Sequence, residues 1–133
     1  MDALRSRLAK IPIFATLRFQ IDSIASGEAR LTAPYEKRYD GVFESFHGGL
    51  LMTLADTAAL VAVLSVAGAA ATVTTTDMNI RFLGPCRTDV TAHARVLKSG
   101  RTLCPVSVDL FDRTGLLVAV AQVTYIRLTI KRD

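Results

Sequence analysis

The feature that most constrains this chain is one long apolar stretch, from Phe46 to Ala71. Leucine, alanine and valine fill most of it, so the stretch has almost no polar face. Such a segment either crosses a membrane or forms a helix that is buried within a globular protein. Asp56 stands near its middle, where a charge costs about 2.5–3.5 kcal/mol in a bilayer, and no aromatic or basic anchor flanks its C-terminal side. We therefore predict a buried central helix and no membrane association.

Length and composition predict a single globular domain over residues 1–133. A chain of 133 residues has room for one core, and its 50% hydrophobic and 21% charged residues exclude intrinsic disorder. The mean hydropathy of +0.34 is high for so short a chain. A body of this size cannot easily bury so much apolar surface alone, so we expect a large oligomeric interface.

Charge and cysteine content exclude several classes of function. The net charge is +4, but the lysines and arginines are scattered, which argues against a nucleic-acid-binding module and suits a small anionic ligand. Two cysteines and two histidines stand outside any metal-binding spacing, so we predict no metal and no cofactor. The first ten residues are charged throughout and lack the apolar core of a signal peptide. We expect a cytoplasmic protein with reduced thiols.

Outside the apolar stretch, the sequence predicts one short helix and six strands. Residues 2–9 read as an amphipathic helix with Asp2 as its N-cap and Pro12 just beyond its end. Alternating patterns divided by turn residues predict strands at about 15–23, 27–33, 71–83, 88–98, 101–112 and 116–129. The last strand is apolar on both faces, so we expect it in the middle of the sheet or at an interface. The fold class is therefore α+β, an antiparallel sheet curved around one central helix.

The start of the predicted central helix is a candidate binding site. His47, Gly48 and Gly49 follow a loop over residues 34–45 that is longer than most connections. Consecutive glycines let a ligand approach the backbone closely. The first amides of a helix are unpaired donors at the positive end of its dipole, so they suit a developing negative charge. A tight turn is the simpler alternative for this triplet.

Asp56 is the candidate catalytic carboxylate. It is the only acidic residue between Glu44 and Asp77. A carboxylate within an apolar helix is costly unless it has partners, and such residues concentrate at functional sites. The alternative is a structural aspartate that is hydrogen-bonded to a neighbouring backbone group or hydroxyl, such as that of Thr53 or Thr57. We favour the functional interpretation.

The spacing of these two features predicts a dimer. Gly48 and Asp56 are eight positions apart, which corresponds to about 12 Å along a helix. One substrate carbonyl group cannot contact both within one chain. If both act on it, they come from two chains whose helices run antiparallel about a two-fold axis, giving a homodimer with two equivalent sites.

The sequence resembles hotdog-fold thioesterases of the phenylacetate-degradation and human thioesterase-superfamily-member type. The main motif is His47-Gly48-Gly49, with Ala55-Asp56-Thr57-Ala58 beginning six positions after Gly49. The similarity covers nearly the whole chain. Four further segments match: Thr75-Thr76-Asp77-Met78-Asn79-Ile80, Phe82-Leu83-Gly84-Pro85, Lys98-Ser99-Gly100-Arg101, and the turn from Asp112 to Gly115.

The resemblance implies a hotdog fold and an acyl-coenzyme A thioesterase, for which coenzyme A is part of the substrate rather than a cofactor. It implies that the Gly48 amide stabilises the oxyanion and that Asp56 is either nucleophile or general base. His47 would orient the substrate and Thr75 the attacking water. The assembly would be a homodimer that pairs into a dimer of dimers. Substrate contacts would come from Gly49 and, at the coenzyme A phosphates, from Lys98, Gly100 and Arg101.

Two positions depart from the family pattern. Relatives usually carry Asn or Gln six residues before the histidine, where this chain has Gly41. They usually carry Gly three residues before it, where this chain has Glu44, either a second substrate-binding carboxylate or, as we favour, a surface residue. Gly41 favours an alternative function, a non-catalytic hotdog protein that binds acyl-coenzyme A or another ligand. Asp56 favours an enzyme.

A hydratase or dehydratase is a third option within this fold. Asp40 and His47 supply suitable residue types for proton transfer, but their spacing is not that of hydratases. The residues leave open the acyl chain, the choice between coenzyme A and an acyl-carrier protein, and the choice between dimer and tetramer.

Overall fold

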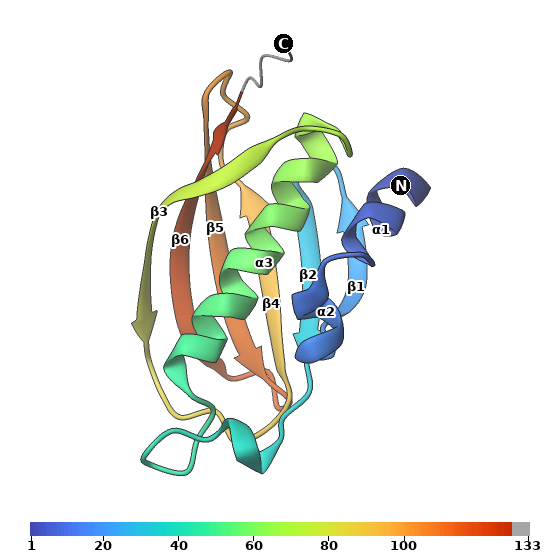
Figure 1. The fold of residues 1–133 in the computed structure, drawn as a ribbon. Helices are drawn as coiled ribbons and strands as arrows, with labels where there is room; N and C mark the ends of the chain where they lie inside the picture. Colours follow the sequence, from blue (N-terminus) through green and yellow to red (C-terminus); the bar gives the residue numbers. More distant parts are fainter. Residues whose placement is uncertain (129–133) are drawn as a thin grey trace.

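The structure, a computed structural model that describes residues 1–128, is a six-stranded antiparallel sheet curved around one long helix (Figure 1). The central helix α3 spans Gly48–Ala67. Two short helices, α1 (Asp2–Leu8) and α2 (Pro12–Thr16), precede the sheet, and a 3-10 turn covers Lys37–Tyr39. In spatial order the strands are β1 (Gln20–Ala25), β2 (Glu28–Ala33), β4 (Val90–Val96), β5 (Leu103–Asp112), β6 (Leu117–Arg127) and β3 (Val73–Phe82).

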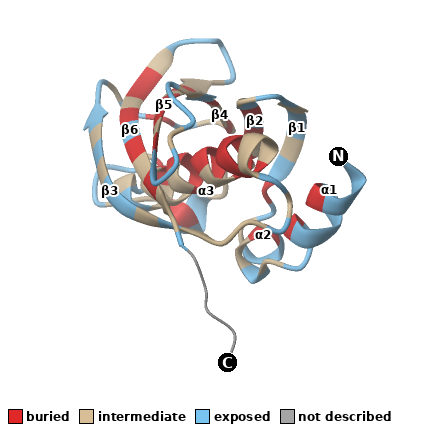
Figure 2. Cartoon of the chain, turned by 90° about the horizontal axis from the view of Figure 1, so that it is seen from above, coloured by how far each residue is buried: buried red, intermediate tan, exposed pale blue. Residues whose placement is uncertain are grey.

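Helix α3 lies in the concave side of the sheet and packs its buried side chains into the core (Figure 2). Its small side chains, above all alanine, let the strands approach its backbone closely. The helix has the length and hydropathy of a membrane span, but 56% of its most apolar window is buried inside the chain. The predicted buried helix and the α+β class are confirmed. The buried residues of α3 are Leu51, Leu54, Ala55, Thr57, Ala58, Ala59, Val61, Ala62, Val63 and Leu64.

The sheet separates an apolar inner face from a more polar outer face, as the alternating patterns predict. On β5, Val106 and Val108 are fully buried against α3, whereas Ser107 and Asp109, which alternate with them, are only half-buried on the other side. Strand β6 lies between β5 and β3, so it is an interior strand as expected of one that is apolar on both faces, but it is next to the edge strand rather than in the middle of the sheet.

The N-terminal predictions need correction. Met1, not Asp2, is the N-cap of α1, and Asp2 lies in its first turn. The strand predicted over 15–23 begins only at Gln20, because the preceding residues form α2, with Pro12 at its start and Phe14 buried. Proline is favoured at the first position of a helix, and packing of Phe14 against the core stabilises this short one. The last strand ends at Arg127, and residue 129 of its predicted range lies outside the described residues.

Truncation of the α3 core is expected to destabilise the whole fold. Leu54 is fully buried between α3 and the sheet, and Leu54→Ala should lower the free energy of unfolding by about 2–5 kcal/mol. Leu116→Ala is the matched control, because Leu116 is 60% exposed and surface changes are typically within about 0.5 kcal/mol. Urea unfolding of both variants measures the difference. Equal losses in the two variants would contradict the burial described here.

Candidate active site

The Asp56 carboxylate is held from the sheet rather than from its own helix. Thr75 Oγ1 donates a hydrogen bond to Asp56 Oδ1 over 2.6 Å. The Tyr125 hydroxyl lies 2.9 Å from the same Oδ1 and 2.9 Å from the Asp56 carbonyl oxygen. The structure therefore brings Thr75, to which the resemblance assigns the attacking water, into direct contact with Asp56. Asp56 itself is half-buried in the single chain.

The neighbouring helix hydroxyls do not contact the carboxylate. Thr53 donates to the carbonyl of Gly49 over 2.9 Å, and Thr57 donates to the carbonyl of Thr53 over 2.7 Å. Threonine in a helix commonly bonds to the carbonyl one turn earlier. Thr53 and Thr57 are therefore not the partners of Asp56, whose hydroxyl partners come from β3 and β6 instead.

A β-bulge at Thr76 aims Thr75 at the helix. Thr75 pairs with Tyr125, and the next pair joins Asp77 to β6, so Thr76 has no partner of its own. An extra residue of this kind shifts the alternation of side chains along a strand. Thr75 and Met78 are three positions apart, yet Thr75 bonds to Asp56 and Met78 packs against the core.

Tyr125 is the site residue that the sequence analysis missed. Its side chain is only 4% exposed. Burial raises the pKa of the Tyr125 phenol, and the adjacent Asp56 carboxylate raises it further, while a hydrogen bond with Thr75 lowers it. The phenol therefore stays protonated and acts as a hydrogen-bond donor. The available signal was weak, because a tyrosine among apolar residues of a central strand reads as core.

The start of α3 leaves one amide free. His47 is the N-cap, and its Nδ1 accepts a hydrogen bond from the Gly49 amide over 2.9 Å. The amides of Leu50 and Leu51 donate to the His47 carbonyl. Within residues 1–128, no acceptor contacts the amide of Gly48. His47 thus organises the helix start, and Gly48 carries an unpaired amide donor at the positive end of the helix dipole.

An apolar groove of about 430 Å³ borders Gly48. The Phe82 ring closes one side of it, and a β-carbon on Gly48 would lie 2.9 Å from Phe82 Cζ. Phe82 is 51% exposed although it ends the inner face of β3. Glycine at position 48 therefore lets the ring lie directly against the helix start. The other lining residues are Phe43, Ser45, Phe46, Leu51, Leu83, Gly84, Pro85 and Cys86.

A family model described as the thioesterase superfamily matches residues 43–119, more than half of the chain, including the helix start, Asp56 and Thr75. The chain belongs to the thioesterase superfamily. The chain is thus a thioester hydrolase, and helix α3 and strands β3, β4 and β5 lie within the matched residues.

Curated relatives of this thioesterase include acyl-coenzyme A thioesterase 13 of Homo sapiens, 36% identical over 100 residues that cover 73% of the chain and 71% of the relative. The Mus musculus protein of the same name is 30% identical over 115 residues, covering 83% and 81%. A thioesterase family protein from Silicibacter pomeroyi has a similar structure, with a TM-score of 0.90, 28% identity and coverage of 97% and 98%. The E. coli PaaI protein from the phenylacetic acid degradation operon shares the fold, with a TM-score of 0.89, 23% identity and coverage of 96% and 92%. The predicted hotdog fold is confirmed.

The remaining predicted residues of this thioesterase lie apart from Asp56. Glu44 is exposed in the loop before α3, and its carbonyl accepts a hydrogen bond from Arg87 Nε over 3.1 Å. Lys98 and Arg101 are exposed in the turn between β4 and β5. The same turn requires glycine at position 100, because a β-carbon there would collide with the Leu103 carbonyl oxygen.

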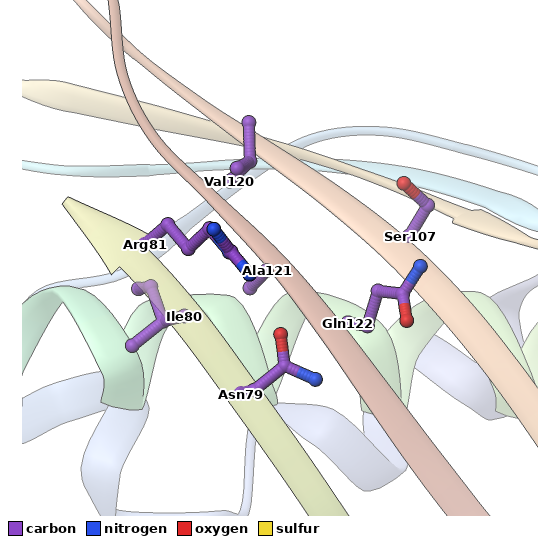
Figure 3. A pocket seen from close by; sticks show the side chains of 7 residues that line it. All are labelled: Asn79, Ile80, Arg81, Ser107, Val120, Ala121 and Gln122. Carbon is purple, nitrogen blue, oxygen red and sulfur yellow. The ribbon is translucent and has the colours of Figure 1, made fainter. Parts of the chain in front are cut away.

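A second hollow, of about 630 Å³, lies on the face of the sheet opposite α3 (Figure 3). Figure 3 shows that its polar side chains come from β3, β5 and β6, and Asn79, Arg81 and Gln122 among them are exposed. None of the groups around Asp56 or Gly48 takes part in it. Its lining residues are Asn79, Ile80, Arg81, Ser107, Val120, Ala121 and Gln122.

Proposed function

We propose that this thioesterase hydrolyses acyl-coenzyme A to a free acid and coenzyme A, with Asp56 as its catalytic carboxylate. The family match and the mammalian relatives that carry the name acyl-coenzyme A thioesterase support the substrate class. The observation that carries the proposal is the held carboxylate of Asp56, together with the unpaired amide of Gly48 on the same helix.

The two groups divide the chemistry of hydrolysis. The Gly48 amide donates a hydrogen bond to the carbonyl oxygen as that oxygen becomes negative. Asp56 either removes a proton from the water that attacks the carbonyl carbon or attacks that carbon itself, forming an anhydride that water then cleaves. In both routes the carbon–sulfur bond breaks, the thiolate of coenzyme A leaves and takes up a proton, and one water is consumed.

The proposed site is shared between two chains. Helix α3 is continuous from Gly48 through Asp56, so the two groups are about 12 Å apart along its axis. Strand β3 is at the edge of the sheet and has a pairing partner on one side only. Such an edge is able to pair with the same strand of a second copy about a two-fold axis. We propose a homodimer in which Asp56 of one subunit acts opposite Gly48 of the other, and a dimer of dimers as its extension.

Subunit mixing tests the shared site. Asp56→Asn and Gly48→Pro homodimers are each expected to be inactive, since each lacks one group at both sites. A mixed dimer has one site with both groups intact and one with neither. After equal mixing with unfolding and refolding, activity should return to about one quarter of the wild-type value, since half of the dimers are mixed and each has one working site.

The same experiment includes its control. Each variant refolded alone should stay inactive, and light scattering should give the mass of a dimer or a tetramer. If a mixture that contains mixed dimers recovers no activity, the site is not shared between chains. The description of the fold would still hold.

We propose that further exposed residues, besides Asp56 and Gly48, bind the substrate. Lys98 and Arg101 are exposed cations that suit the phosphates of coenzyme A, and Gly49 lies at the helix start. Glu44 is exposed, which supports the surface interpretation for its carboxylate. We further propose that the reaction takes place in the cytoplasm and uses no metal or cofactor.

Thiol release from a panel of acyl-coenzyme A substrates, followed with a chromogenic thiol reagent, tests the proposed reaction. Gly41, which replaces the amide of relatives, is the feature that favours the competing function, binding without turnover. A β-carbon at this position would lie 3.7 Å from His47 Cδ2, so the amide that relatives place there would border the helix start. Saturable release above the buffer rate supports hydrolysis. Binding of coenzyme A without release across the panel would support the binding function instead.

A further inference from the structure

The two oxygens of the Asp56 carboxylate have different surroundings. Oδ1 accepts from both Thr75 and Tyr125, whereas Oδ2 has no hydrogen bond to any residue within 1–128. Oδ2 is also not among the buried polar atoms that lack a partner in that part of the chain. It therefore reaches the surface of the chain, where a substrate or a water molecule has access.

Tyr125 holds residue 56 at two atoms at once. Its hydroxyl lies 2.9 Å from Oδ1 of the side chain and 2.9 Å from the carbonyl oxygen of the same residue. A donor shared between the main chain and the side chain of one residue restricts rotation about the Cα–Cβ bond. The ring itself is buried on β6, opposite Thr75 on β3, so the sheet fixes the position of the hydroxyl.

Thr75 alone would not orient the carboxylate in this way. Its one hydrogen bond to the carboxylate fixes one distance, and a carboxylate held at one point is still able to rotate. With Tyr125 as a second donor to the same oxygen, the free oxygen points in one direction only. Preorganisation of this kind contributes to catalysis because small displacements of a reacting group are costly.

We infer that Tyr125 is a positioning residue that holds Asp56 through Oδ1. Oδ2 is then the oxygen that reacts with water or with the thioester. This inference rests on the proposed function of Asp56. It applies equally to the general base and to the nucleophile, because either role needs one unbonded carboxylate oxygen at a fixed place.

Tyr125→Phe tests the inference, since it removes the hydroxyl and keeps the ring. The expected result is a kcat lowered on the order of 10- to 100-fold, with KM unchanged. In an Asp56→Asn background the same substitution should have no further effect on kcat, because the residue that it positions no longer reacts. Tyr35→Phe is the matched control, since Tyr35 donates over 2.5 Å to a different carboxylate, that of Asp40, and its kcat should equal that of the wild type.

The outcomes separate the inference from the proposed function. If Asp56→Asn abolishes turnover while Tyr125→Phe retains the wild-type kcat, the positioning role is wrong and the proposed function survives. A Tyr125→Phe variant with a lowered melting temperature and an unchanged kcat would likewise show that the hydroxyl is purely structural. If Asp56→Asn retains turnover, the proposed function itself fails. Should Tyr125→Phe fold poorly, Thr75→Val replaces it, as it removes the other donor to Oδ1 and is expected to lower kcat in the same way.

Discussion

Asp56→Asn is expected to lower kcat for acyl-coenzyme A hydrolysis by about 10²- to 10⁴-fold, the usual contribution of a positioned base. Asparagine has nearly the same shape, and its amide oxygen is able to accept from Thr75 and Tyr125 as the carboxylate does. The fold and the local hydrogen bonds should therefore persist. What is lost is the negative charge that removes a proton or attacks the carbonyl carbon.

Steady-state thiol release measures this effect, with Asp77→Asn as the matched control. Asp77 is an exposed carboxylate on β3, two residues from Thr75, and its side chain has no hydrogen bond or ion pair to the site within residues 1–128. The control should retain the wild-type kcat. If the Asp56→Asn variant is folded and as active as Asp77→Asn, Asp56 takes no part in the reaction.

Gly48→Pro is expected to lower kcat by about 10²- to 10³-fold, because proline has no amide hydrogen and the loss of one oxyanion donor typically has this cost. The position tolerates proline in other respects. Gly48 is the first residue of α3, where proline is favoured. His47 before it has φ −57° and ψ 130°, the extended conformation that a residue preceding proline adopts.

Gly48→Ala separates the missing amide from the added bulk. Both substitutions place a carbon against the Phe82 ring, which is half-exposed and able to move aside. Only the proline removes the hydrogen-bond donor. The ratio of the two kcat values therefore measures the amide, and a ratio near one would show that the Gly48 amide does not stabilise the oxyanion.

The fold followed from patterns that are local in the sequence. The unbroken apolar run predicted a buried helix, and the observed α3 lies within it. The alternation over 101–112 predicted a strand that the structure places at Leu103–Asp112. Residues 12–16 were assigned wrongly in part, because five residues carry too little periodicity to separate a helical turn from a strand, and burial of Phe14 decides the outcome.

The site was only half predictable. Asp56 was identifiable as a charge in an apolar helix, and Thr75 followed from the resemblance. Their contact was not predictable, because it depends on how strands that are distant in sequence pair with each other. Tyr125 is 69 positions from Asp56, and only the register of β6 against β3 brings it there. The bulge at Thr76 is equally hidden, since three consecutive threonines give no indication of which one faces the helix.

Both proposed reacting groups belong to one stiff element. Helix α3 has no proline and no glycine after Gly49, so it moves as a single rod. In the proposed dimer each rod contributes its beginning to one site and its middle to the other. Any tilt or rotation of one helix would then disturb both centres together, and an insertion of one residue between Gly49 and Asp56 would turn the two groups by about 100° relative to each other.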